Sequence, residues 1–381
     1  MSPASLAPFL HPGYQPADED ERGLWHECEQ LEYEIASSNL LLRDPALGAY
    51  VGGITNRLLG DRDFGVRTYI VRDPDFNASM FPNGMMLVHT GLLARMRNEA
   101  QLAAVLGHEC GHFLRQHSLQ RHRDLRRKAT ASALFELAAA GATGSTGDNW
   151  FNLASGINTV LILSVFTFSR EQESEADAYG LKLMGESAYV PGAAAAVWAQ
   201  LIEERKASAA ARNKRYRDRA TSQLSTHPPS AGRMQDLAAS ADELAAGARA
   251  GRAFEDRRAE WLAAVAPVRA ELLQEQVKLN DPGASLYLLG SLAADGWDGT
   301  LRYFEGEAYR LRGGVDDPAR AAAAYGAAVA FVDAPAEAWR AHGYALLKAG
   351  RTDDGRRALG RYLELKPDAM DAAMVRFSLA Q

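Results

Sequence analysis

The chain has 381 residues, of which 47% are hydrophobic and 24% are charged. These values are ordinary for folded globular proteins and exclude disorder of the whole chain, a collagen and a coiled-coil rod. The 42 basic and 48 acidic residues leave a net charge of -6, so composition indicates no nucleic-acid partner. At about 150 residues per domain, the length predicts roughly two to three domains.

The sequence shows neither a membrane span nor a signal peptide. Its longest mainly apolar run, residues 157–168, contains four polar residues and is shorter than the roughly 20 residues that cross a bilayer. Residues 1–16 lack both a basic region and an apolar stretch of signal-peptide type. Two cysteines, Cys28 and Cys110, allow one disulfide or two free thiols, so they do not fix the redox compartment.

The first half of the chain is predicted to form helices and one small antiparallel sheet. Residues 1–20 read as an irregular lead-in, and two helices follow between residues 21 and 59, with a break at Asp44 and Pro45. Strands are expected at 66–71 and 85–89, with a turn at 82–84 between them. The clearest helical periodicity runs from Asn98 to about Ser118, with Glu99 at the positive N-terminal end.

The middle of the chain contains two segments with alternative interpretations. Residues 131–168 predict a pair of buried or half-buried helices, which could form a lipid or substrate surface or simply pack in the core. Further helices are expected from 169 to 184 and from 192 to 206. Residues 205–219 are rich in Arg and Lys, and they could bind phosphate or anionic lipid or form a solvated face.

The last third of the chain contains an internal repeat. Residues 304–310 and 339–345 are similar at an offset of 35, close to the tetratricopeptide period of about 34. A more degenerate unit is expected between 267 and 298, and a generic bundle of helical hairpins is the alternative. We therefore predict three regions: a lead-in at 1–20, a main domain at 21–240 and a helical repeat domain of tetratricopeptide (TPR) type at 241–381.

An H-E-x-x-H motif, from His108 to His112, lies in the clearest predicted helix. Because the two histidines are four residues apart, they project from one face of the helix, where both imidazoles can bind one metal ion. Glu109 lies beside them and can act as the general base that activates water for peptide hydrolysis. The motif predicts a catalytic Zn²⁺ site.

A catalytic zinc needs a third protein ligand. The metzincin continuation requires a Gly and a His where this chain has Arg115 and Ser118, so that class is excluded. His117 is five residues past His112 and is expected to point to another side of the helix, where it makes a structural hydrogen bond. His122, in a run of arginines, is expected to be solvated.

A carboxylate from a later helix is the remaining option for the third ligand. Glu173 and Asp177 are four residues apart, so one helix face offers a ligand and a second carboxylate that can accept the other ring N–H of a ligating histidine. Glu171 and Glu175 are rival ligands, for which an exposed helix face is the expected location.

These motifs resemble those of the HtpX-like and CAAX-prenyl-protease-like gluzincins, metallopeptidase family forty-eight, and more narrowly their soluble bacterial periplasmic members with TPR repeats. The resemblance covers about residues 30–240. It implies a mainly α (α+β) gluzincin fold, Glu173 as third ligand, Asp177 as the aspartate of the family's Glu-x-x-Ala-Asp block, and a location in the periplasm or cell envelope. Cys110 departs from the aliphatic residue common at its position. The resemblance rests on residues 76–78, 82–84, 89–93, 99–112, 169–177, 227–229 and Arg233.

His227 corresponds, by this resemblance, to a histidine that can approach the metal from a loop. Two alternatives stay open: a fourth ligand that displaces the catalytic water and keeps the enzyme latent, or a residue that stabilises a Pro-rich turn. The donor to the oxyanion is also open among His227, Arg233 and Tyr216. We expect an extended substrate to add to the strand near 77–81.

The leading functional hypothesis is a zinc-dependent endopeptidase of protein substrates, whose TPR-like domain recruits protein partners. The alternative is a chaperone or assembly adaptor with a mainly structural zinc site. An aminopeptidase is disfavoured because no carboxylate adjacent to the motif is placed to hold a free N-terminus. Peripheral contact with a membrane stays open.

Overall fold

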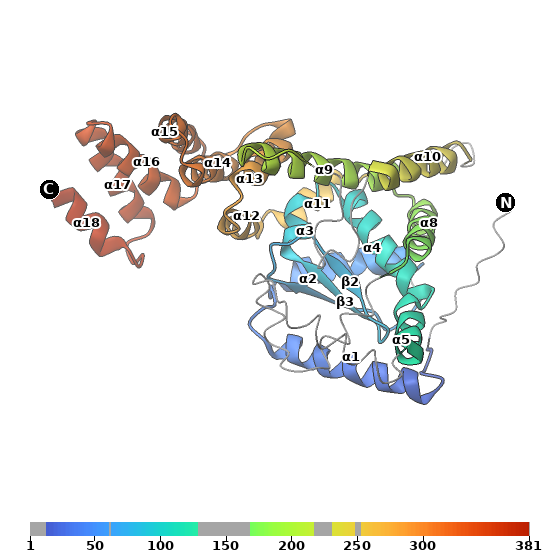
Figure 1. Ribbon diagram of the computed structural model, residues 1–381. Coiled ribbons are helices and arrows are strands. Elements are labelled where there is room, and N and C mark those ends of the chain that lie inside the picture. Colours follow the sequence, from blue (N-terminus) through green and yellow to red (C-terminus); the bar gives the residue numbers. More distant parts are fainter. Residues whose placement is uncertain (1–12, 61, 129–167, 217–230, 248–252, 381) are drawn as a thin grey trace. The chain divides into compact units, whose positions relative to one another are not determined.

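The computed structural model describes residues 13–60, 62–128, 168–216, 231–247 and 253–380. The chain divides into two compact units, and Figure 1 labels their elements. The N-terminal unit comprises residues 1–201 and 218–267, and the C-terminal unit comprises 202–217 and 268–381. The helix pair expected within 131–168 lies almost entirely outside the described residues, and His227 lies wholly outside them.

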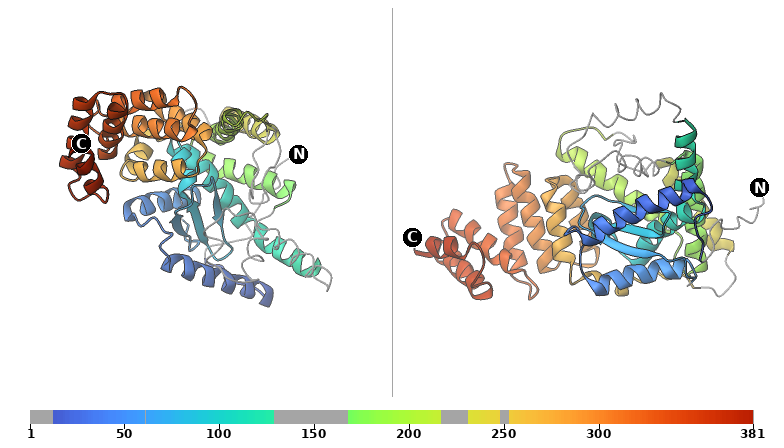
Figure 2. Two further views of the ribbon diagram at one scale, coloured as in Figure 1. Left: turned by 60° about the vertical axis from the view of Figure 1, so that its left-hand side comes forward. Right: turned by 90° about the horizontal axis from the view of Figure 1, so that it is seen from below.

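A three-stranded sheet lies between helices in the N-terminal unit (Figures 1 and 2). Alternate residues of its central strand face opposite sides. Met85 and Leu87 pack with Leu24 and Leu31 of the first helix, whereas Met86 faces the second helix, where its sulfur is 3.5 Å from the Thr55 hydroxyl. The elements are α1 (Glu19–Ser37), α2 (Pro45–Leu58), β1 (Arg67–Val71), β2 (Ala78–Met80) and β3 (Met85–His89).

The small sheet is mixed: it contains an antiparallel pair, but the strands expected at 66–71 and 85–89 pair in parallel and not antiparallel. The strand order is β1-β3-β2; β3 pairs in parallel with β1 and antiparallel with β2. The turn at residues 82–84 joins β2 to β3, and β1 therefore reaches β3 through a connection that contains β2. The consequence is that β2 is an edge strand of this sheet.

The H-E-x-x-H helix α4 (Glu99–Leu114) crosses helix α8 (Arg170–Glu186) at very short range. A Cβ atom on Gly180 of α8 would lie 2.9 Å from the backbone nitrogen of His108, and one on Gly111 would lie 2.8 Å from the carbonyl oxygen of Ala176. Real Cβ atoms do not approach backbone this closely, so the crossing requires residues without side chains. It brings the carboxylates of α8 beside the histidines of α4.

The start of α4 is held by a buried carboxylate. Asn98 caps the helix, and its side chain accepts a hydrogen bond from the backbone of Gln101 at 2.8 Å. Glu99 is only 2% exposed; it forms an ion pair with Arg57 at 2.5 Å and accepts a hydrogen bond from the Tyr189 hydroxyl at 2.5 Å. These contacts connect the start of α4 to α2 and to the segment that follows α8. They act in addition to the favourable charge that Glu99 places at the N-terminus of the helix, which the sequence predicted.

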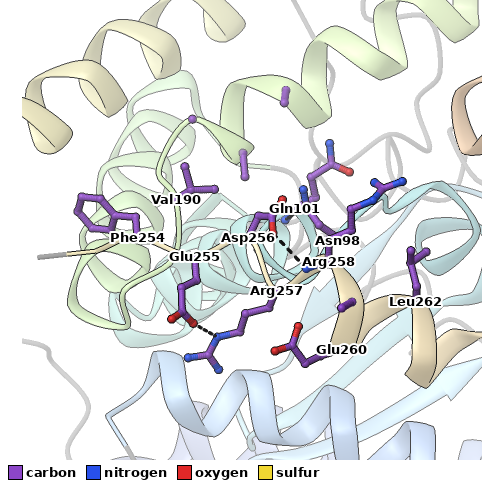
Figure 3. Close-up of a pocket in the computed structure, with 14 residues that line it drawn as sticks. Asn98, Gln101, Val190, Phe254, Glu255, Asp256, Arg257, Arg258, Glu260 and Leu262 are labelled. Atoms are coloured by element: carbon purple, nitrogen blue, oxygen red, sulfur yellow. Dashed lines mark hydrogen bonds and ion pairs between the residues drawn. The ribbon is translucent and has the colours of Figure 1, made fainter. Parts of the chain in front are cut away.

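An open hollow of about 1060 Å³ lies beside the same end of α4 (Figure 3). Residues 254–262 form one wall, and the backbone N–H of Ala100 donates to the carbonyl of Asp256 there. Within the hollow, the Arg257 guanidinium bonds Glu255 at 3.1 Å. The histidines and Glu173 are not among its lining residues, so it is separate from the site below.

The C-terminal unit is a succession of helices in which neighbours pack on one another, and the repeat predicted from the sequence falls on two helical hairpins. In the basic segment that begins at residue 205, before the repeat, Lys206 pairs with Glu203 and Arg212 pairs with Asp281. The unit contains α12 (Arg269–Lys278), α13 (Pro282–Leu292), the 3-10 helix η1 (Ala293–Asp295), α14 (Gly299–Arg312), α15 (Asp317–Ala328), α16 (Ala336–Lys348), α17 (Thr352–Leu365) and α18 (Ala372–Ala380).

The predicted class, mainly helical with a small sheet, is confirmed. Among the described residues, no helix combines the length and the apolar character that crossing a membrane requires. The other helices are α3 (Thr90–Arg95), α5 (His117–Lys128), α9 (Ala193–Ala211), α10 (Ala231–Gly247) and α11 (Arg258–Val265).

Replacing Gly180 by Ala should separate α4 from α8. We expect the free energy of unfolding to fall by about 1–3 kcal/mol, the usual cost of overpacking, in chemical denaturation. The matched control is Gly53→Ala in α2, where an added Cβ meets nothing within 4 Å and should stabilise by up to about 1 kcal/mol. Equal effects of the two substitutions would contradict the close crossing.

Candidate active site

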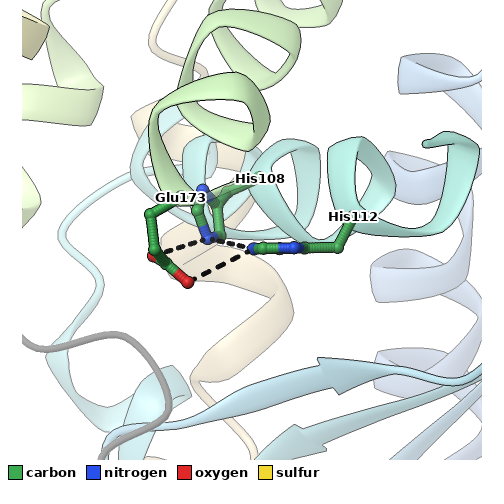
Figure 4. A group of neighbouring side chains, drawn as sticks. All are labelled: His108, His112 and Glu173. Atoms are coloured by element: carbon green, nitrogen blue, oxygen red, sulfur yellow. Dashed lines mark hydrogen bonds and ion pairs between the residues drawn. The ribbon is translucent and has the colours of Figure 1, made fainter. Parts of the chain in front are cut away.

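Three side chains from α4 and α8 converge on one point (Figure 4). The Nε2 atoms of His108 and His112 are 3.0 Å apart. The carboxylate of Glu173 lies against both, with Oε2 at 3.6 Å from the first and Oε1 at 3.6 Å from the second. One ligand atom from each residue lies within 4.8 Å of the others, so the structure brings the three predicted ligands together.

The donor set fits zinc. Nitrogen and oxygen ligands about 2.1 Å from a tetrahedral ion lie about 3.4 Å from one another, which is close to the separations between His108, His112 and Glu173. Two imidazoles and one carboxylate also leave the open fourth position of a catalytic site. Both histidines are buried, being 6% and 2% exposed, so the ion would be held away from bulk water on their side.

Asp177 contacts the ring of His108 at the nitrogen that does not face Glu173: Oδ1 of Asp177 is 2.8 Å from Nδ1 of His108. An N–H at Nδ1 that donates to the carboxylate leaves the lone pair of Nε2 free to bind a metal. Burial alone would raise the pKa of Asp177, but the hydrogen bonds and charges of His108 and Arg233 lower it well below its usual range. Asp177 therefore stays ionised and keeps accepting the ring proton.

Arg233 of α10 lies against two carboxylates of α8. Its guanidinium contacts both oxygens of Asp177 at 2.7 Å and Oε2 of Glu173 at 2.9 Å, and it lies over the ring of Trp198 at 4.4 Å. Burial lowers the pKa of Arg233, but these carboxylates, together with Glu109, raise it above its ordinary value. The only role that the sequence suggested for Arg233 was that of a candidate oxyanion donor; its pairing with the carboxylates requires the packing of α10 on α8.

Glu109 and Cys110 follow His108 on α4, and both are buried, at 3% and 0% exposure. The charge of Glu109 reaches Arg233 across the site. Cys110 and Cys28 are free cysteines, and burial raises the pKa of both thiols far above the usual range. Neither thiol is therefore available as a thiolate ligand or nucleophile.

The position of His117 differs from the sequence expectation. Helix α4 ends at Leu114, Gln116 adopts a left-handed conformation with φ 53°, and α5 begins at His117. This turn brings the ring of His117 to His112, with the two Nδ1 atoms 2.8 Å apart, so it does not point to another side. His122, expected to be solvated, is half-buried on α5.

Glu175 is also not a freely exposed residue of the helix face. Its Oε2 lies 2.9 Å from Nε2 of His117, and its Oε1 lies 2.8 Å from Nε of Arg115. Glu171, by contrast, is exposed, as expected. Tyr216 belongs to the C-terminal unit, where its ring lies beneath the Lys206 ammonium at 6.0 Å.

Two histidines one turn apart and a carboxylate from a crossing helix are the donors that zinc metallopeptidases use, and comparison with known proteins agrees. The sequence profile of peptidase family M48 matches residues 41–241, more than half of the chain, and the chain belongs to this family. The profile spans α2 to α10 and includes all three candidate ligands.

Individual relatives point to the same family. The chain is 33% identical over 155 residues to the mitochondrial metalloendopeptidase OMA1 of Schizosaccharomyces pombe, covering 40% of this chain and 43% of the relative. It is 26% identical over 215 residues to the beta-barrel assembly-enhancing protease of Yersinia pestis and 25% identical over 218 residues to that of Escherichia coli; each match covers 55% of this chain and 42% of the relative. The matches thus span less than half of each relative.

Removing the carboxylate of Glu173 should lower the metal affinity by more than the 10–100-fold that is typical when a residue supporting a ligand is replaced. We expect one zinc per chain in the wild type and far less in Glu173→Ala at equal total zinc, measured by elemental analysis after dialysis. Glu186→Ala, at the exposed end of the same helix, should retain the metal. Full zinc content in Glu173→Ala would exclude Glu173 as a ligand.

Proposed function

We propose that the protein is a zinc-dependent endopeptidase that hydrolyses peptide bonds of protein substrates. The observation that carries this proposal is the convergence of His108, His112 and Glu173 with ligand spacing beside an intact Glu109. Zinc bound there supplies a Lewis acid that polarises the scissile carbonyl and makes water acidic. In this proposal the three residues hold the ion, and Asp177 orients the ring of His108.

Glu109 is the proposed general base. Its carboxylate takes a proton from the attacking water and later passes it to the leaving amine. Glu109 is buried near charged side chains, and this supports the role. Where water is excluded, the electrostatic attraction between a carboxylate and a nearby proton is stronger. Arg233 pairs with Asp177 and Glu173, and its Nη2 also lies 3.2 Å from Nδ1 of His108; these contacts favour a role in holding the two carboxylates over the direct oxyanion contact considered from the sequence.

We propose that a peptide substrate binds along the edge strand β2. An extended peptide can add its backbone to an exposed edge and present alternate side chains to the protein. Met80 of β2 and His112 line one small cavity of about 10 Å³, which supports the proximity of this strand to the ligands. A peptide paired with residues 78–80 would therefore pass beside the zinc site.

We further propose that the region 241–381 is a TPR-like domain that recruits protein partners, and that the enzyme acts in envelope protein quality control in the bacterial periplasm. A groove of about 670 Å³ on this region, lined by Tyr309, Tyr344, Arg310 and Arg340 among others, supports a binding role. The name of one group of relatives, beta-barrel assembly-enhancing protease, supports a role in the assembly of beta-barrel proteins.

Glu109→Gln separates the peptidase from the adaptor with a structural zinc site. The amide keeps the shape of the side chain but cannot take a proton, so cleavage of an unfolded protein substrate should fall by at least the 10²–10⁴-fold that general base catalysis supplies. Zinc content should stay at the wild-type level. If the variant cleaves or complements a deletion strain as well as the wild type, the adaptor is favoured.

Latency through His227 is the finer part of the proposal. If this histidine fills the fourth position on the metal, His227→Ala should raise peptidase activity on a short fluorogenic peptide, whereas Ser225→Ala in the same segment should leave it unchanged. A loss of activity, or no change, would argue against His227 as a ligand that blocks the fourth position on the metal. It would favour a structural role in the Pro-rich turn.

A further inference from the structure

We propose that His117 and Glu175 form a hydrogen-bond relay that fixes the tautomer and orientation of His112, the second histidine of the zinc site. The inference rests on the proposed zinc site and assigns to it two positioning residues. Neither residue touches the point where the three ligands converge; both act through His112.

The relay is continuous from the ligand to the surface. Nδ1 of His112 is 2.8 Å from Nδ1 of His117, and Nε2 of His117 is 2.9 Å from Oε2 of Glu175. The other oxygen of Glu175 is 2.8 Å from Nε of Arg115. His117 is 0% exposed, whereas the side chain of Glu175 is 28% exposed, so the buried imidazole links the ligand to a partly solvated ion pair.

The direction of the hydrogen bonds follows from the groups at the end of the relay. The carboxylate of Glu175, paired with a guanidinium, can only accept, so Nε2 of His117 carries a proton and donates it. In a neutral ring Nδ1 of His117 is then the acceptor, and the proton between the two rings must reside on Nδ1 of His112. The lone pair of His112 is thereby placed on Nε2, which faces Glu173.

Neutrality of His117 is consistent with its surroundings. The imidazole is 0% exposed, and Glu175 accepts on its Nε2 side at 2.9 Å. The titratable and charged groups near it are His112 and His108 on α4, Arg115 before α5 and Glu175 on α8. An imidazolium at His117 would donate from both ring nitrogens, so Nδ1 of His112 would have to accept and the proton of that ring would lie on Nε2, where it would block a metal.

The two histidines of the proposed zinc site are therefore oriented in similar ways, each by a hydrogen bond from its Nδ1. His108 donates directly to Asp177, which is paired with Arg233. His112 donates to His117, and only then does a carboxylate follow, paired with Arg115. The arginine on each outer carboxylate keeps it ionised and in place, so that both rings present Nε2 to the same point.

The first test uses Glu175→Ala, because a partly exposed residue can be removed without disturbing the core. Zinc affinity of the full chain, measured by competition with a chelator, should fall about 10–100-fold, as for other residues that support a ligating histidine. Glu171→Ala removes an exposed carboxylate from the same helix and should leave affinity unchanged. Circular dichroism of the metal-free protein should show both variants folded at the temperature of the measurement, so that a loss of zinc affinity confined to Glu175→Ala reports the relay and not unfolding.

The second test replaces His117 itself. His117→Gln can still accept from His112 and donate to Glu175, so it should keep most of the zinc affinity, whereas His117→Leu should lose it about as much as Glu175→Ala does. A double variant of His117→Leu and Glu175→Ala should be no worse than the worse single variant, because residues in one chain of contacts are not additive.

Nitrogen-15 spectra of the imidazoles provide a readout that does not depend on metal. In the metal-free wild type, His112 should show a protonated Nδ1 and an unprotonated Nε2, and in Glu175→Ala the two tautomers should mix. Wild-type affinity in Glu175→Ala, or the opposite tautomer of His112 in the wild type, would overturn the relay. Absence of zinc binding by the wild type would instead refute the proposed function, and the spectra would still decide the relay.

Discussion

The site depends on the close crossing of α4 and α8. Helices usually pack with their axes 8–10 Å apart because side chains separate them, but Gly180 and Gly111 place the backbone of one helix against that of the other. This crossing lets Glu173 reach two histidines that belong to a segment more than sixty residues earlier in the chain. A carboxylate on a helix held further away could not close the triangle of ligand atoms.

Charges buried beside this crossing are stable only because they are paired. A carboxylate removed from water is costly unless hydrogen bonds and an opposite charge compensate it. Arg233 pairs with Asp177 and Glu173, and Arg115 pairs with Glu175. Each pair lies next to one of the two histidines of the candidate site, so the same side chains that compensate the buried charges would also orient these rings for a metal. Such preorganisation lowers the reorganisation needed for binding.

The sequence could pair the candidate ligands and their supporting residues because each pair follows a local rule. Residues four apart on a helix share a face, which suffices to place His108 with His112 and Glu173 with Asp177. The relay was not predictable in this way: it depends on Gln116 adopting a positive φ, which a residue other than glycine rarely does, and this turn redirects His117. The parallel pairing of β1 with β3 was likewise missed, because strand neighbours are set by packing over a distance and not by the nearest turn.

The most direct test of the account is X-ray absorption at the zinc edge on the zinc-loaded wild-type protein. We expect a first coordination shell of only nitrogen and oxygen at about 2.0–2.2 Å, with the outer-shell scattering of two imidazoles. A sulfur at about 2.3 Å, or fewer than two imidazoles, would contradict it, because the ion would then lie somewhere other than between His108, His112 and Glu173.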